Sequence, residues 1–171
     1  MAAKKTTISR KILIDAPKKD VWNFVSDFGG IYKGNPMVSK SYLTSDQKTG
    51  VGTTRHCDMN MMGASVDEKI IGWVEGESIK VDIYEKKNMP MVGNMVADFS
   101  VHEQGKQTLL KATMEYDMTG GMGDMMNAVM MKKMNVGVWE KLLAGFKKHI
   151  ETKVIVEKRT PLDLELVEKI A

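Results

Sequence analysis

Arg55 and Glu68 are the two charged residues whose placement best suits them to act together. They lie in strand-like stretches on either side of a turn at residues 60–63. If Met59 pairs with Ala64 around that turn, antiparallel pairing places the arginine directly opposite the glutamate, with both side chains on one face. The spacing therefore predicts a cross-strand ion pair.

The neighbours of Glu68 indicate which face this is. Val66 and Ile70 alternate with Asp67 and Lys69, so the apolar positions place the glutamate on the inner face of its strand. Two charges buried there need each other to offset the loss of water. We expect the pair inside a concavity, where it could fix the polar end of a ligand. The alternatives are a structural pair at the rim of the sheet, or a register slip that exposes both residues.

The cysteine and the histidines of the sequence give little support for nucleophilic or metal chemistry. Cys57 is the one thiol of the chain, so it forms no internal disulfide and no cysteine-rich zinc site. His56 should point to the opposite face of the same strand, which excludes a nucleophile–base pair. His102 and His149 have no partner at a metal-ligand spacing, and there is no glycine-rich phosphate loop. We expect no catalytic triad, metal or cofactor; an enzyme would have to use Glu68 as its acid or base.

Composition narrows the class of protein. The net charge of +3 over 171 residues gives no dense basic patch of the kind that nucleic-acid binding requires. No stretch approaches the ~20 apolar residues that a membrane-spanning helix needs, and no apolar run follows the lysines near the N-terminus. The expectation is a cytoplasmic protein with neither a nucleic acid nor an integral membrane segment among its partners.

Methionine is the outlier, with 16 residues against 4 phenylalanines. Its flexible thioether fills irregular gaps and lines adaptable binding surfaces, so the excess indicates either a loosely specified core or a ligand or partner surface. Met122, Met126, Met130 and Met134 form a line that drifts away from the core face of a predicted helix. That line favours a homodimer contact or a pocket mouth. Copper(I) is disfavoured, because the segment holds no histidine or cysteine.

Hydrophobic alternation predicts the elements that must position these side chains. Between the first two strands, Pro17 opens a short helix with an apolar face at Val21, Trp22 and Val25, and a broken second helix or loop follows at 27–36. Short turns between the later strands indicate an antiparallel meander. The seven predicted strands are 8–14, 38–44, 51–59, 64–74, 78–87, 95–103 and 107–118.

A long helix is predicted at residues 124–151, roughly 40 Å from end to end. Asn135 is the polar residue on its otherwise apolar face, so it should orient a ligand oxygen, bond a strand or bind a buried water. The opposite face carries Lys133, Glu140, Lys141, Lys147 and Lys148. The face expected on the sheet holds Ala128, Met131, Asn135, Val138, Trp139, Leu142, Phe146 and Ile150.

The pattern of residues 153–171 allows more than one local structure. We expect a domain at 1–152 and an extension at 153–171, with 153–158 either continuing the helix or forming a short strand. Thr160-Pro161 is a helix-start signal. Such a helix would carry its apolar side on Leu162, Leu166, Val167 and Ile170.

Over about residues 5–151 the chain resembles the polyketide cyclase/dehydrase-like and lipid-transfer superfamily, which includes birch-pollen-allergen and START-related proteins. The motifs that carry the resemblance are Ile14-Asp15-Ala16-Pro17 followed by Val21-Trp22, then Ser26-Asp27-Phe28-Gly29, Asn35-Pro36 and Val51-Gly52-Thr53-Thr54-Arg55. It implies an α+β helix-grip fold, in which a curved sheet wraps around the C-terminal helix and leaves a cavity between them. It does not imply one chemistry, because one fold hosts many functions.

The leading hypothesis is a non-catalytic carrier of a hydrophobic small molecule of lipid, isoprenoid or polyketide type. The alternatives are a cyclase or dehydratase that uses Glu68, and an interaction module or homodimer formed through Met126, Met130 or the C-terminal tail. The residues expected to line the cavity are Arg55, Glu68, Ile70, Val81, Ile83, Phe99, Leu110, Met114, Met131, Asn135, Val138 and Leu142.

Overall fold

The computed structural model describes residues 5–89, 92–119 and 124–170, with side chains of the long helix described from Ala128 onward. These residues form one antiparallel sheet in the order β2-β3-β4-β5-β6-β7-β1-β8. The strands are β1 Thr6–Ile14, β2 Val38–Leu43, β3 Thr54–Met59, β4 Ser65–Val74, β5 Ser78–Lys87, β6 Val92–Gln104, β7 Gln107–Met118 and β8 Glu168–Lys169. The helices are α1 Lys18–Ser26, the 3-10 helix η1 Phe28–Lys33, α2 Asp124–Thr152 and the 3-10 helix η2 Leu164–Leu166.

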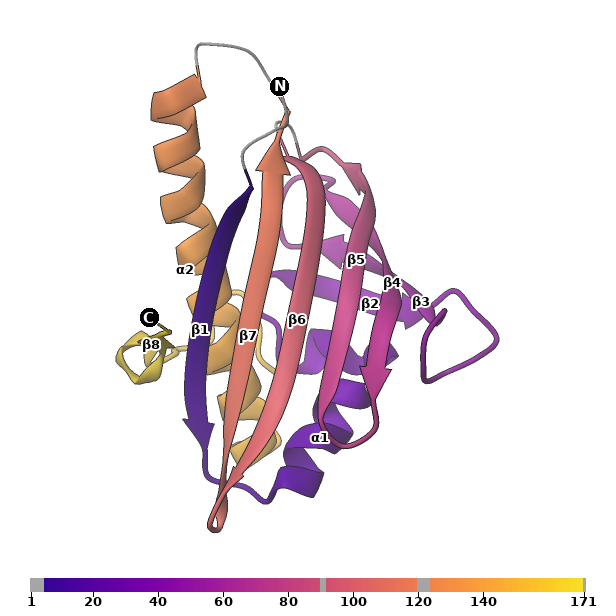
Figure 1. Ribbon diagram of the computed structural model, residues 1–171, viewed down its shortest axis with the longest axis vertical. Helices are drawn as coiled ribbons and strands as arrows, with labels where there is room; N and C mark the ends of the chain where they lie inside the picture. Colours follow the sequence, from indigo (N-terminus) through magenta and orange to yellow (C-terminus); the bar gives the residue numbers. More distant parts are fainter. Residues whose placement is uncertain (1–4, 90–91, 120–123, 171) are drawn as a thin grey trace.

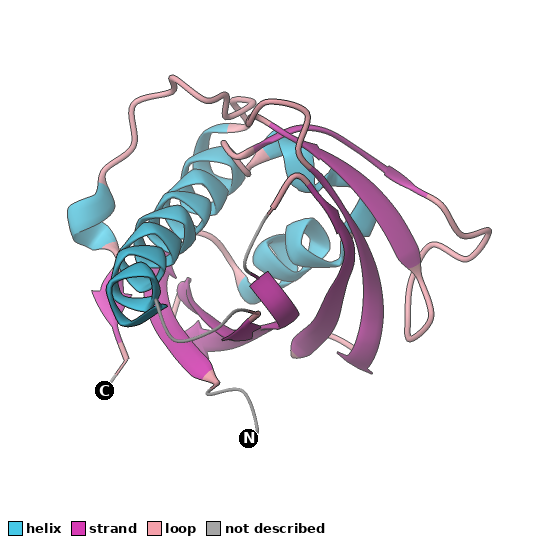
Figure 2. Cartoon of the chain, turned by 90° about the horizontal axis from the view of Figure 1, so that it is seen from above, coloured by secondary structure: helices cyan, strands magenta, loops and turns pink. Residues whose placement is uncertain are grey.

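The sheet bends around the helices, with α2 along one side and α1 near one end (Figures 1 and 2). Consecutive strands from β2 to β7 pair as a meander, and β1 then pairs with β7. Because one face of this sheet is apolar, it must be covered, and α2 is long enough to cover it. The predicted α+β helix-grip fold is confirmed, although the described residues form eight strands rather than seven.

The extra strand comes from the tail, where the prediction of a helix after Thr160 was wrong. Only the single turn η2 forms, with Asp163 Oδ1 accepting a hydrogen bond from the backbone of Glu165. β8 then pairs with Arg10 and Lys11 of β1. An edge strand offers unpaired backbone groups, so the tail gains more from adding to the sheet than from extending a short helix. The boundary at residue 152 stays a prediction.

The second correction concerns the start of β3, which begins at Thr54 rather than at residue 51. Gly50 and Gly52 have φ values of 85° and 97°. This left-handed conformation suits glycine and breaks an extended strand. The two glycines therefore form the turn that leads into β3 and do not belong to the strand.

The C-terminal half of α2 is clamped tightly to the rest of the fold. Leu143, Phe146 and Ile150 are buried, and the Phe146 ring meets the Phe24 ring edge to face at 4.9 Å. A Cβ atom on Gly145 would lie 2.2 Å from the carbonyl oxygen of Gly34, so the helix backbone touches the end of η1 directly. This close approach fixes where the helix sits over the sheet.

Two glycines of α2 make a matched test of that contact. Gly145→Ala should destabilise the protein by about 1–2 kcal/mol, because overpacking against Gly34 outweighs the better helix propensity of alanine. Gly137→Ala should stabilise it by about 0.5–1 kcal/mol, because a Cβ there meets no atom within 4 Å. Chemical denaturation measures both. A Gly145→Ala variant as stable as Gly137→Ala would contradict the clamp.

Candidate ligand-binding site

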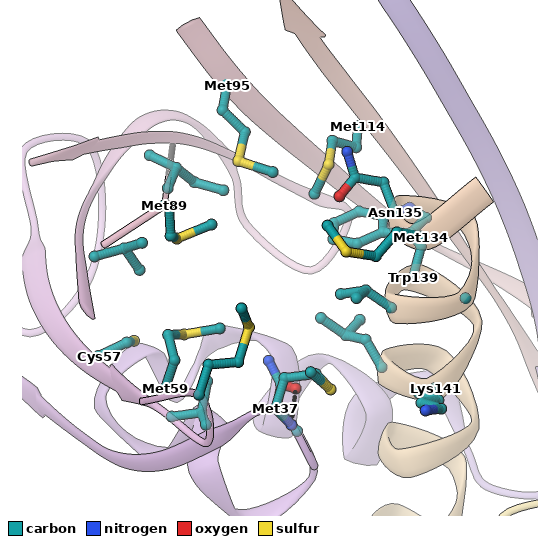
Figure 3. Close-up of a pocket in the computed structure, with 18 of the residues that line it drawn as sticks. Met37, Cys57, Met59, Met89, Met95, Met114, Met134, Asn135, Trp139 and Lys141 are labelled. Carbon is teal, nitrogen blue, oxygen red and sulfur yellow. Dashed lines mark hydrogen bonds between the residues drawn. The ribbon is translucent and has the colours of Figure 1, made fainter. Parts of the chain in front are cut away.

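A cavity of about 450 Å³ lies between the sheet and the part of α2 from Lys133 to Leu142. Here the helix contacts β7 through Trp139 and β1 through Glu140, and the cavity opens on its other side, toward β3, β4 and β5. Figure 3 shows side chains from both walls facing each other across the space. The sheet wall consists of Val38, Arg55, Cys57, Met59, Val66, Glu68, Ile83, Met95 and Met114. The helix wall consists of Lys133, Met134, Asn135, Gly137, Val138, Trp139, Lys141 and Leu142.

Methionine dominates the lining. Among the described residues, seven of the chain's sixteen methionines line this one cavity, and they come from strands, loops and α2. Six of them are labelled in Figure 3, where their side chains approach the space from several directions. A wall of thioethers is apolar and adaptable. The seven are Met37, Met59, Met61, Met89, Met95, Met114 and Met134.

The predicted register of Arg55 and Glu68 is confirmed. The two residues face each other across β3 and β4, and both are buried. Arg55 Nε donates to Glu68 Oε2, and Arg55 Nη1 donates to the carbonyl oxygen of Phe28 at 2.8 Å. The guanidinium also lies 3.9 Å from the centre of the Phe28 ring. The register-slip alternative is therefore wrong, and η1 holds the arginine from the side opposite the glutamate. A role of the pair in ligand binding stays a prediction.

Cys57 and His56 lie on opposite faces of β3, as predicted. The Cys57 thiol is buried and donates to Glu68 Oε2 at 3.8 Å. Burial, with the negative charge of Glu68 beside it, raises the pKa of this thiol far above its usual value. His56 instead bonds to Asp67 and Asp58 on the outer face. A buried thiol with a raised pKa stays protonated at neutral pH, which makes it a poor nucleophile.

Asn135 is the buried amide of the helix wall, with 7% of its surface exposed. Its Nδ2 has no hydrogen-bond partner among the described residues, so the predicted bond to a strand does not form there. Figure 3 shows the side chain reaching from α2 toward Met114, with the oxygen turned to the cavity. An unpartnered buried amide costs about 1–3 kcal/mol. The amide oxygen, which faces the cavity, can accept a hydrogen bond from a ligand hydroxyl, so Asn135 is a candidate ligand contact.

The structure brings only some of the predicted cavity residues to the cavity. Those that line it are Arg55, Glu68, Ile83, Met114, Asn135, Val138 and Leu142. The prediction was wrong for those that do not, which are Ile70, Val81, Phe99, Leu110 and Met131. Four of these five are packed in the core, and Phe99 contacts the rings of Trp139 and Phe146. Met131 is only half-buried. Inward alternation identifies a core face, but it does not show which part of that face borders the cavity.

The prediction also missed lining residues on the strands, on α2 and in the loops. Asn35, Met37, Met61 and Met89 line the cavity from connections between strands. Alternation says nothing about loops; the clustering of methionine in the turns at 60–63 and 88–93 was the available signal. Lys133 and Lys141, expected on the solvent face, border the cavity as well, because its lining extends further around the helix than the apolar stripe does.

The predicted methionine line contributes little to the cavity. Met134 lines it and is 48% exposed, whereas Met130 and Val129 lie outside the lining and are 63% and 67% exposed. Met122 and the side chain of Met126 lie outside the described residues. A homodimer through this face or the tail stays a prediction. None of the helices in the described segments has the length and apolar character needed to cross a membrane.

The comparisons with known proteins agree with the architecture. A family model described as "Polyketide cyclase / dehydrase and lipid transport" matches residues 5–151. No curated protein gives a significant match.

Three solved structures share the fold. One, from Nitrosospira multiformis, is 19% identical, with 88% of this chain and 98% of that chain covered and a TM-score of 0.65. An uncharacterised protein from Bacillus thuringiensis is 16% identical, with 86% and 99% covered and a TM-score of 0.66. One from Thermus thermophilus is 16% identical, with 86% and 99% covered and a TM-score of 0.71. At these identities the likeness extends to the fold alone.

The Arg55–Glu68 pair yields a stability prediction. Glu68→Ala should cost about 3–5 kcal/mol, because it leaves a buried guanidinium without its carboxylate. The double variant Arg55→Met/Glu68→Leu should recover most of that loss. Glu168→Ala is the matched control: it breaks the exposed pair with Lys11 and should cost less than about 1 kcal/mol. Denaturant unfolding measures the free energy of unfolding of each variant. Equal losses in Glu68→Ala and Glu168→Ala would contradict the burial of the pair.

The outer-face histidine yields a prediction about pH. The hydrogen bond to Asp67 raises the pKa of His56, and Asp58 adds to the effect against partial burial. Because the folded pKa exceeds the unfolded one, the stabilisation is fully present below about pH 6.5 and is lost as pH rises through the folded pKa. The stability difference between wild type and His56→Gln should therefore be larger at pH 5.5 than at pH 9.

His102 provides the control for this experiment. Burial, together with Lys111 and Lys18 nearby, lowers the pKa of His102. For a lowered pKa the sign reverses, so wild type should lose stability relative to His102→Gln as pH falls. Equal slopes for the two variants would contradict the assignment of the His56–Asp67 contact.

Proposed function

The chain belongs to the polyketide cyclase/dehydrase and lipid transport family, and from this premise we propose that it binds and carries one apolar small molecule in the cavity between α2 and the sheet. The observation that supports this is the cavity of about 450 Å³ with its methionine lining. That volume falls in the range of small-molecule pockets, ~300–1,000 Å³. Lipid, isoprenoid and polyketide-like molecules are the classes that fit an apolar space of this kind.

Burial of the ligand's apolar surface supplies the affinity of the protein for the ligand. Each methylene moved from water into the cavity contributes about 0.8 kcal/mol. The ligand occupies the space between α2 and β3, β4 and β5, so it covers apolar wall that the helix leaves uncovered. The methionines adjust to its shape, since their side chains repack at low cost.

The polar groups of the wall then orient the ligand. Arg55 is held by Glu68 and by the carbonyl of Phe28, so the pair is a fixed polar point in an apolar surface. Asn135 offers an amide on the facing wall. A ligand with one polar end and an apolar body suits this arrangement, because few polar groups among many apolar ones set orientation rather than affinity.

A carrier is supported better than the cyclase or dehydratase alternative. Glu68 lines the cavity, so an acid or base there would mainly need freedom to exchange a proton. Glu68 Oε2 instead accepts hydrogen bonds from Arg55 and from Cys57. These contacts suit a carboxylate that holds its neighbours in place, and no contact of Glu68 with the described residues favours proton transfer.

Filling the cavity tests the proposal. Val138→Trp places a large ring in the space from the helix wall and should weaken the binding of apolar ligands at least tenfold without unfolding the protein. The measurement is calorimetric titration with oleate, farnesol and an anthraquinone polyketide, together with native mass spectrometry of protein from its source cells. Val74→Trp is the control, since Val74 is exposed on β4 and lies outside the cavity lining.

Two results would contradict the proposal. One is a wild-type protein that is ligand-free under every extraction condition and shows no binding across the panel. The other is equal binding by Val138→Trp and Val74→Trp, which would place the ligand elsewhere on the molecule.

A further inference from the structure

The charges around the cavity do not cancel. Its lining holds four charged residues, of which Arg55 and Glu68 neutralise each other. The other two, Lys133 and Lys141, make no hydrogen bond or ion pair within the described part of the chain. Nor does the helix offer them a partner. The residues three and four positions away from them are Val129, Met130, Val136, Gly137, Val138, Ala144 and Gly145, and none is acidic.

The two lysines lie along one edge of the cavity. Positions 133, 137 and 141 are successive turns on one side of α2, which places the two lysine Cα atoms about 12 Å apart. Both lysines are exposed, whereas Asn135 and Trp139, toward the other edge of the lining, are buried. The lysine edge is therefore the mouth of the cavity; Figure 3 shows Lys141 on the helix beside it.

Gly137 leaves open space on the helix surface between Lys133 and Lys141. A Cβ atom at this position would meet no atom within 4 Å, so the helix surface is open there. A head group placed over Gly137 would have one ammonium group on each side along the helix. The arrangement thus combines an unobstructed opening with two positive charges that no described residue balances.

We propose that the ligand is an amphiphile with an anionic head, a carboxylate or a phosphate. The head sits at the mouth over Gly137 between Lys133 and Lys141, and the apolar tail extends among the methionines. This inference rests on the proposed function and narrows its ligand class. Charge-assisted hydrogen bonds from the lysines hold the head, and because both lysines are exposed, salt weakens this contribution.

The test compares ligands that share a tail and differ in the head. Calorimetric titration at low salt uses laurate, lauryl alcohol and dodecyl phosphate. Laurate or dodecyl phosphate should bind about tenfold or more tightly than the alcohol. Whichever anion binds more tightly identifies the head as a carboxylate or a phosphate, and added salt should narrow the gap to the alcohol.

The variant Lys133→Gln/Lys141→Gln should bind both anions only as tightly as the alcohol and leave alcohol binding unchanged. Lys106→Gln/Lys132→Gln is the matched control. It removes the same net charge from exposed lysines outside the cavity lining and should leave all three affinities unchanged.

The outcomes separate this inference from the proposed function. If alcohol and anions bind equally, or the two double variants behave alike, the inference is overturned while the carrier function stands. If none of the three ligands binds, the carrier function loses its support as well. Vesicles of phosphatidylcholine with phosphatidylglycerol form the last arm. Loss of vesicle binding in Lys133→Gln/Lys141→Gln with unchanged laurate affinity would assign the lysines to a membrane surface and overturn the inference.

Discussion

The backbone contact between Gly145 and Gly34 limits where α2 can lie over the sheet. Two glycines allow α2 to touch the end of η1, and the aromatic contact of Phe146 with Phe24 secures the same region. With its C-terminal half held in this way, the helix direction is set. Its preceding turns contact β7 through Trp139 and β1 through Glu140, and the cavity is the space left between these turns and β3, β4 and β5.

Part of the site could be predicted from the sequence, whereas another part depends on the position of α2. The alternation of Val66, Glu68 and Ile70 and the length of one turn were enough to place Arg55 opposite Glu68, because strand pairing is local once a turn is known. Ile70 and Leu110 were equally inward-facing, yet they are core residues. Whether such residues line the cavity or pack in the core depends on the tilt of α2. That tilt is a tertiary property, which no local sequence pattern reveals.

Two other differences have local causes. The tail was expected to be helical from its Thr-Pro start, but the open edge of β1 offered backbone partners that a short helix lacks. Lys133 and Lys141 were placed with the solvent face because periodicity divides a helix into two sides. Where a helix borders a cavity, a third kind of position exists: the edge, where a residue contacts both the solvent and the space within.

The methionine wall carries a thermodynamic consequence. A free methionine side chain samples many rotamers, and ordering one costs up to roughly 1.5–2 kcal/mol of conformational entropy. When a molecule fills the cavity, several of Met37, Met59, Met61, Met89, Met95, Met114 and Met134 lose part of that freedom together. A rigid wall of leucine or phenylalanine would bind one shape more tightly. This wall accepts a range of shapes, each with a smaller gain, which suits the proposed carrier function, because a carrier must release its cargo as well as hold it.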